Sequence, residues 1–212
     1  SAAAGNDLLP VFQSFQFAGT SFPDQIAADS RGTIWFSDPS ANRVLAIDPI
    51  TNAATAVLVP GGSPDGLCVD DKDRVWMGLY VTNLGGNTLS VIDGRTLKVT
   101  RTIPTGQDPH FAVATPDGRR LFVTMAGADQ VWVFDTASDK VLAKIPLGLR
   151  PTHLAMAPDG KFDYASLETS QEVGVINTLT QRVEARIPTG PEPHITSVSR
   201  DGKVVFVGGA ES

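Results

Sequence analysis

The chain of 212 residues lacks the residue types and motifs on which several common kinds of functional site depend. Cys68 is its only cysteine, so it can form neither a disulfide within the chain nor a cysteine-based zinc or haem site. It has no Gly-x-Ser-x-Gly elbow and no glycine-rich phosphate loop with a lysine, which argues against the commonest nucleophile and nucleotide sites. No apolar run approaches the roughly 18 residues of a membrane span, so we expect no such span.

Basic residues are too few and too scattered for a nucleic-acid partner. The 17 Lys and Arg residues are outnumbered by 23 Asp and Glu residues, and the formal net charge is −6. Nucleic-acid binding depends on clustered positive charge, so we expect neither DNA nor RNA to bind. The content of 42% hydrophobic and 19% charged residues is ordinary for a globular protein, and we expect residues 1–212 to form a single domain.

The stretch from Ser1 to Asp7 is small and polar, like the residues around a signal-peptidase site. This composition would fit a protein that was processed after export. A frayed terminus or an expression remnant explains it equally well, so the stretch does not decide the compartment.

One sequence unit occurs five times and organises the chain. Its clearest copy runs from Asp108 to Gly118 and is followed by the apolar run Leu121–Thr124. A proline marks each copy, with spacings of 41, 45, 42 and 42 residues: Pro23, Pro64, Pro109, Pro151 and Pro193. A fixed period of this size, built from short β-rich runs, predicts a β-propeller.

Each repeat contains a small-residue strand, a turn with Gly or Asp, a second strand with aromatic residues, a third strand and an outer strand. The fold class is therefore an all-β propeller with about five four-stranded blades. Each third strand ends in a residue that can accept a hydrogen bond from the backbone two residues on, and we expect these residues to form turns. They are Asp48, Asp93, Asp135 and Asn177.

The last blade lacks part of its sequence pattern, because the chain stops at Ala210–Ser212, after the second strand. Three explanations are open: truncation of a longer propeller, closure with fewer strands, or a strand supplied by a partner. The alternating run Val11–Phe17 has the register of a fourth strand, and we expect it to pair in the last blade. A missing third strand would expose a sheet edge and favour self-association.

The tetrapeptide Tyr-Val-Thr-Asn at positions 80–83, followed by Asn87–Asp93 and Ile103–Gly106, resembles the YVTN-repeat β-propellers. The first repeat, with Gly32–Asp38, is similar to the repeat of the streptogramin B lyases. The resemblance implies a propeller that commonly has seven blades and a periplasmic or extracellular location. It also implies a role as a scaffold that binds a small molecule or a protein at the face where the central channel opens.

Polar residues beside the marker prolines are the candidate site, because these positions should surround the opening of the central channel. All three histidines fall there, and histidine with carboxylate is typical of divalent-metal sites and of acid–base catalysis. The predicted ligand-binding residues are Asp24, Asp65, Asp108, His110, Arg150, His153, Glu192 and His194. Asp38 and Glu168 lie near the same rim, and we expect them to be solvated or to cap loops.

Two interpretations of this site remain. Polar groups at the start of an inner strand can bind backbone amides or channel water, and we expect polar, water-filled binding in preference to tight metal ligation. The lyase resemblance instead implies magnesium, with His194 as general acid or base and Glu192 as a binding or polarising group. This chain departs from the lyase pattern at Arg150–His153, where we expect His153 to point away from the axis, and at Phe206–Gly209, which carries no carboxylate. No cofactor is certain, and the enzyme interpretation ranks second.

Overall fold

The computed structural model describes residues 26–28, 32–48, 50–51, 53–60, 62–70 and 78–209. These residues form five antiparallel sheets, numbered blades 1 to 5 in chain order. Blade 1 contains β1 (Ile26–Ala28), β2 (Ile34–Asp38), β3 (Arg43–Ile47) and β4 (Ala54–Leu58). Blade 2 contains β5 (Pro64–Asp70), β6 (Gly78–Asn83), β7 (Thr88–Asp93) and β8 (Lys98–Pro104).

Blades 3 and 4 repeat this plan, and blade 5 has two described strands. Blade 3 contains β9 (Pro109–Ala114), β10 (Arg120–Met125), β11 (Gln130–Asp135) and β12 (Val141–Pro146). Blade 4 contains β13 (Pro151–Met156), β14 (Phe162–Leu167), β15 (Glu172–Asn177) and β16 (Arg182–Pro188). Blade 5 contains β17 (Pro193–Val198) and β18 (Val205–Gly209).

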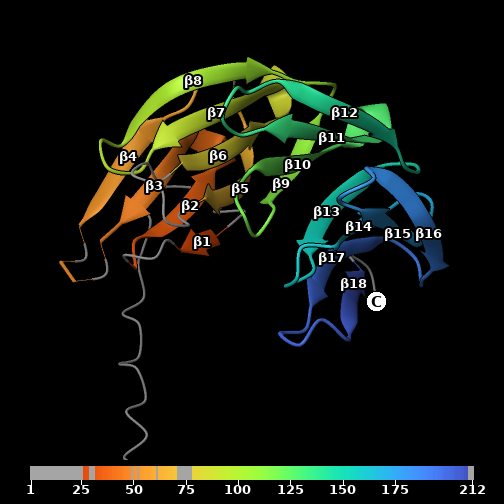
Figure 1. The fold of residues 1–212 in the computed structure, drawn as a ribbon. Coiled ribbons are helices and arrows are strands. Elements are labelled where there is room, and N and C mark those ends of the chain that lie inside the picture. Colours follow the sequence, from red (N-terminus) through yellow and green to blue (C-terminus); the bar gives the residue numbers. More distant parts are fainter. Residues whose placement is uncertain are drawn as a thin grey trace, which may run out of the picture.

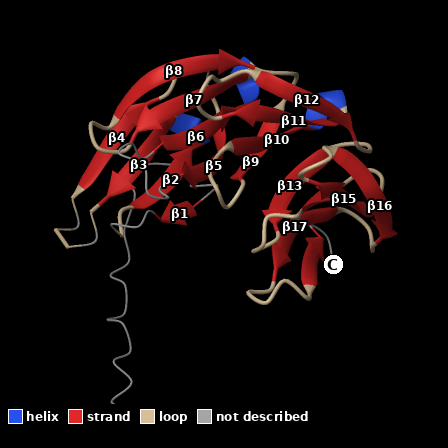
Figure 2. Ribbon diagram, viewed as in Figure 1, coloured by secondary structure: helices blue, strands red, loops and turns tan. Residues whose placement is uncertain are grey.

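The blades follow one another around an open arc, with the first strand of each blade on the inner side and the fourth on the outer side (Figure 1). Figure 2 shows that strands dominate and that the helical segments are short. These segments are the 3₁₀ turns η1 (Pro39–Ala41), η2 (Leu84–Gly86) and η3 (Ala126–Ala128). In the part of the chain that the structure describes, no helix is long and apolar enough to cross a membrane. The predicted all-β propeller is confirmed.

The predicted strand order is confirmed for the first four blades, whereas the closure of the last blade is not tested. Val11–Phe17, which we expect to pair in blade 5, lies outside the described residues. Among the described strands, only β17 pairs with β18.

Apolar side chains pack between consecutive blades and form the core. Trp35 of blade 1 packs with Leu79 of blade 2, and Phe122 of blade 3 packs with Leu167 of blade 4. These side chains are fully buried, because strand alternation turns one face of each sheet toward the preceding blade and the other toward the next. Stability therefore depends on contacts between neighbouring blades, as in other repeat proteins.

The residues that end the third strands form turns, as predicted. Each accepts hydrogen bonds from backbone N–H groups two or three residues on, at 2.8–3.0 Å: Asp48, Asp93, Asp135 and Asn177. The bonds hold the carboxylate form of Asp48 and Asp93, and the pKa of each is lowered, chiefly by the backbone N–H donors. These side chains are therefore structural.

Candidate functional site

The candidate site lies where β5, β9, β13 and β17 begin. Each strand begins at its marker proline, and consecutive inner strands contact each other along the inner side of the arc (Figure 1). Directly after each proline the pairing with the second strand shifts register, which indicates a β-bulge. Because a bulge redirects side chains, the residues after these prolines do not follow simple alternation.

The residues before the four marker prolines in the described ranges have an unusual backbone conformation. Four such residues are left-handed, with φ from 48° to 55°: Ser63, Asp108, Arg150 and Glu192. This conformation costs roughly 1–2 kcal/mol for residues other than glycine. Side-chain oxygens of the preceding blade accept the N–H groups of three of them at 2.8–2.9 Å, in the pairs Asn42–Ser63, Asn87–Asp108 and Asp129–Arg150. Blades 1, 2 and 3 thus each fix the loop that leads into the next blade.

Hydroxyl groups on the second strands brace the bulges. The Thr124 hydroxyl accepts the N–H of Phe111 at 2.9 Å and donates to the carbonyl of Thr152 in the next blade at 2.9 Å. Thr82 and Ser166 make the equivalent bonds in blades 2 and 4. Sequence reasoning missed this role, although the 42-residue spacing of the three hydroxyls could have indicated it.

His110 on β9 faces a carboxylate from the neighbouring blade. Its Nδ1 atom lies 3.4 Å from Oδ2 of Asp65 on β5, and both side chains are mostly buried. Each of the two is the residue after its marker proline, so the repeat spacing predicted their proximity. A carboxylate in this position can orient the imidazole ring.

His194 on β17 belongs to a second pair of this kind. Its Nδ1 atom lies 3.3 Å from Oε2 of Glu168, the residue after β14. The other oxygen of Glu168, Oε1, lies 3.0 Å from Nε of Arg150, the residue before β13. One carboxylate therefore joins a guanidinium and an imidazole that come from different blades.

The two histidine–carboxylate pairs meet. The ring centroids of His110 and His194 are 5.8 Å apart, and the rings are almost perpendicular, at 84°. The site thus combines two imidazoles, two carboxylates and one guanidinium, contributed by blades 2 to 5.

His153, which we expected to point away from the axis, packs against blade 3 near the other two histidines. Its ring packs on Phe111, with centroids 3.8 Å apart. Burial, followed by the nearby His194 and His110, lowers the pKa of His153 to about 4, so the ring is neutral at pH 7. A β-bulge follows Pro151, so the side chains after it depart from simple alternation.

Three predicted residues are not brought to the histidine pairs in the part that the structure describes. Glu192 is exposed, and the carboxylate that pairs with His194 is instead Glu168. The Asp108 carboxylate lies beside Gly127 in the adjoining turn. Asp24 lies outside the described residues.

The expectation that Glu168 is only solvated or a loop cap is wrong, because Glu168 pairs with both Arg150 and His194. Asp38 does cap a loop: its carboxylate accepts from the Ser40 hydroxyl at 2.7 Å and from Arg43 Nε at 2.9 Å. The position of Glu168 at the rim was the only sequence signal for its role.

The magnesium implied by the lyase resemblance does not fit the donor groups in the described ranges. Among these residues no three His, Cys, Asp or Glu side chains are arranged to share a metal ion. Glu211, the last carboxylate that could join Glu192 and His194, lies outside them. We therefore assign no ligand set.

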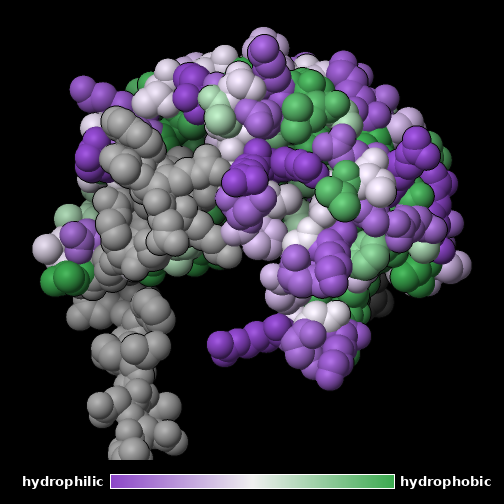
Figure 3. Space-filling view, in the orientation of Figure 1, coloured by the Kyte–Doolittle hydropathy of each residue, from purple (hydrophilic) through white to green (hydrophobic). Residues whose placement is uncertain are grey.

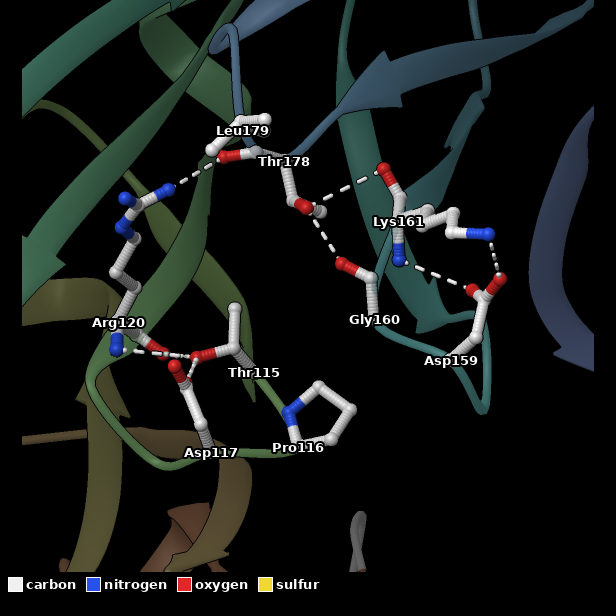
Figure 4. A pocket seen from close by; sticks show the side chains of 9 residues that line it. All are labelled: Thr115, Pro116, Asp117, Arg120, Asp159, Gly160, Lys161, Thr178 and Leu179. Carbon is white, nitrogen blue, oxygen red and sulfur yellow. Dashed lines mark hydrogen bonds and ion pairs between the residues drawn. The ribbon is translucent and has the colours of Figure 1, made fainter.

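A pocket of about 330 Å³ lies at the other end of the strands, between blades 3 and 4 (Figure 4). Its polar groups bind one another: Arg120 donates to the Thr178 carbonyl at 2.7 Å, and Lys161 pairs with Asp159. The face seen in Figure 3 mixes hydrophilic and hydrophobic residues, with hydrophilic residues dominant at the β17–β18 end of the arc. The histidine cluster is therefore the better candidate for a binding site.

Solved structures share this fold. Hydrazine synthase of Kuenenia stuttgartiensis superposes with a TM-score of 0.82 at 24% identity, covering 93% of this chain and 58% of that one. A functionally unknown protein of Desulfotomaculum acetoxidans gives 0.75 at 17% identity, covering 92% and 64%. Virginiamycin B lyase of Staphylococcus aureus gives 0.72 at 13% identity, covering 88% and 69%. The chain spans less than two thirds of the first two proteins.

A comparison with curated proteins found no match. A family model described as Lactonase, 7-bladed beta-propeller matches residues 86–208, which is more than half of the chain. This range contains blades 3 and 4 complete, together with His110, His153 and His194. The expected likeness to streptogramin B lyases is confirmed at the level of the fold. With its repeated four-stranded blades and this match, the chain belongs to the lactonase family of seven-bladed β-propellers.

Proposed function

We propose that this propeller binds a small polar molecule at the inner ends of blades 2 to 5, through the cluster around His110 and His194. The observation that carries the proposal is the convergence of two histidine–carboxylate pairs at a ring separation of 5.8 Å. Convergent polar groups from several elements are typical of small-molecule sites.

The exposed fractions of the side chains define what a ligand would meet. The two side chains that pair with Glu168 are more exposed than its carboxylate. The exposed fraction is 56% for Arg150 and 39% for His194, but 23% for Glu168. A ligand that approaches the site therefore contacts the guanidinium and the imidazole first. Glu168 lies behind them and holds both in place.

The experiment is a screen of small acids, amides and esters by NMR, with isotope-labelled protein. We expect ligands that shift the His194 ring signals to lose binding in His194→Ala. Lys161→Ala, in the pocket at the other end of the strands, is the matched control and should bind the ligand as the wild type does. Ligands that bind both variants equally would contradict the proposal, and so would a screen without any ligand at this site.

A second candidate is the opening of a cyclic ester. It is supported by the intact segment Glu192–Pro193–His194 and by the Glu168 carboxylate, which can orient His194 as an acid or base. The test is incubation with quinupristin, the ligand named for an inactive virginiamycin B lyase, followed by mass spectrometry. A linear product that disappears in His194→Ala would favour catalysis. An unchanged antibiotic, with and without magnesium, would leave binding as the function.

We also propose an extracytoplasmic location and a partner protein as the alternative occupant of the same face. The resemblance to the YVTN-repeat propellers is the support for both. Immunodetection in cell fractions of the source organism tests the location, and a cytoplasmic signal alone would contradict it.

A further inference from the structure

A carboxylic acid lies in the apolar core between blades 3 and 4. Asp163 on β14 is fully buried, and neither of its carboxyl oxygens has a hydrogen-bond partner. Buried polar groups almost always have partners, so an isolated carboxyl group in a core needs an explanation. The candidate site does not use it, since Asp163 is near the opposite end of its strand from Glu168.

The repeat shows which kind of residue this position normally holds. Asp163 pairs with Ile176 in the ladder, as Leu121 pairs with Phe134 in blade 3 and Leu79 with Ile92 in blade 2. Leu79 and Leu121 are fully buried. Blade 4 therefore places an ionisable group where blades 2 and 3 place leucine.

The surroundings of Asp163 are apolar. It shares a strand face with Ala165 and Leu167, which pack against Phe122 of blade 3. An ionised carboxylate in such a place is costly, and burial raises the pKa of Asp163 well above its ordinary value. The only opposing influence is the nearby backbone N–H of Tyr164.

Two charged side chains between blades 3 and 4 interact with groups other than Asp163. Arg120 of β10 donates to the Thr178 carbonyl of blade 4, and Lys161, in the turn before β14, pairs with Asp159 (Figure 4). Neither contributes to the pKa of Asp163.

We propose that Asp163 makes the contact between blades 3 and 4 dependent on protonation: the core accommodates the neutral acid, and its ionisation loosens this contact. Blade 3 carries His110, whereas Arg150 and Glu168 belong to blade 4. A looser contact therefore separates two parts of the histidine cluster, and this inference holds whether or not that cluster binds a ligand.

The test is denaturant unfolding of the wild type and of Asp163→Leu across pH 4 to 8. A folded-state pKa above the unfolded one means that the folded protein holds the extra proton, so stability is lost as pH rises from about 4 toward the raised pKa. We expect the unfolding constant of the wild type, divided by that of Asp163→Leu, to rise by up to about tenfold per pH unit in this window. The ratio cancels the opposite effect of His153.

Asp159→Asn is the matched control, because Asp159 is exposed and its pKa is lowered; it should not reproduce the effect. Carboxyl ¹³C NMR of the folded wild type provides a measurement that needs no variant. A ratio that is independent of pH, or an Asp163 signal that titrates near the ordinary value of an aspartate, would overturn the proposal.

Discussion

Glu168 and His194 are 26 residues apart in the chain, yet Oε2 of the first lies 3.3 Å from Nδ1 of the second. The contact joins blade 4 to blade 5, and the same carboxylate also pairs with Arg150. It is the relationship on which the proposed binding site depends most directly.

Replacing Glu168 by Gln should weaken ligand binding. The amide keeps the shape but removes the charge that holds Arg150 and His194, and for a partly exposed pair this corresponds to about 0.5–1 kcal/mol, or two- to fivefold in affinity. Titration of a ligand from the NMR screen measures the effect. Glu172→Gln on β15 is the control, and equal affinities in both variants would show that Glu168 does not position the site.

Replacing Thr124 by Val should destabilise the protein. The change keeps the shape but leaves the Phe111 N–H and the Thr152 carbonyl without their hydroxyl partner, which costs about 1–3 kcal/mol at a buried position. Denaturant unfolding measures the loss. Thr100→Val on the exposed strand β8, whose hydroxyl donates to Val91, should cost much less. Similar losses in the two variants would contradict the bracing role.

His153 should make the protein less stable as pH falls below 6.5. Its pKa of about 4 lies below the ordinary 6.5, so the unfolded chain takes up a proton that the folded protein does not. The stability is present above pH 6.5 and is lost by about 3 kcal/mol toward pH 4. Unfolding of His153→Phe, which keeps a ring on Phe111, should lack this loss. A variant with the pH dependence of the wild type would refute the assignment.

The protein should self-associate through blade 5. Phe206 on β18 is 60% exposed, whereas Phe122, at the same place in blade 3, is fully buried against blade 4. An apolar face beside a strand edge that no other described strand pairs with favours the addition of another strand or a second copy. Size-exclusion chromatography should show a concentration-dependent increase in mass that Phe206→Lys reduces. A strict monomer over a wide concentration range would count against this prediction.

The fold could be predicted from the sequence because its signals are local and repeated. The spacing of the marker prolines, the turns between strands and the residues that end the third strands each depend on a few neighbouring residues. Repetition made every signal visible several times. Asp48, Asp93 and Asn177 form the turns that their positions indicated.

The site was only partly predictable, because its contacts join blades. The repeat spacing correctly predicted that His110 and Asp65 lie close together. The sequence named Glu192 and His194 together as ligand contacts, whereas the structure pairs His194 with Glu168. The left-handed backbone of Glu192, with φ of 48°, and the bulge after Pro193 lead to a different pairing.

The sequence by itself determined the β-propeller repeat, the order of the strands and the rim on which all three histidines lie. The tertiary structure decided which charged groups meet, that His153 is buried on Phe111, and that Asp163 occupies a leucine position in the core. The physical reason is that turn formation and strand alternation act over a few residues. Side-chain pairing instead depends on the bulges and on the packing of one blade against the next.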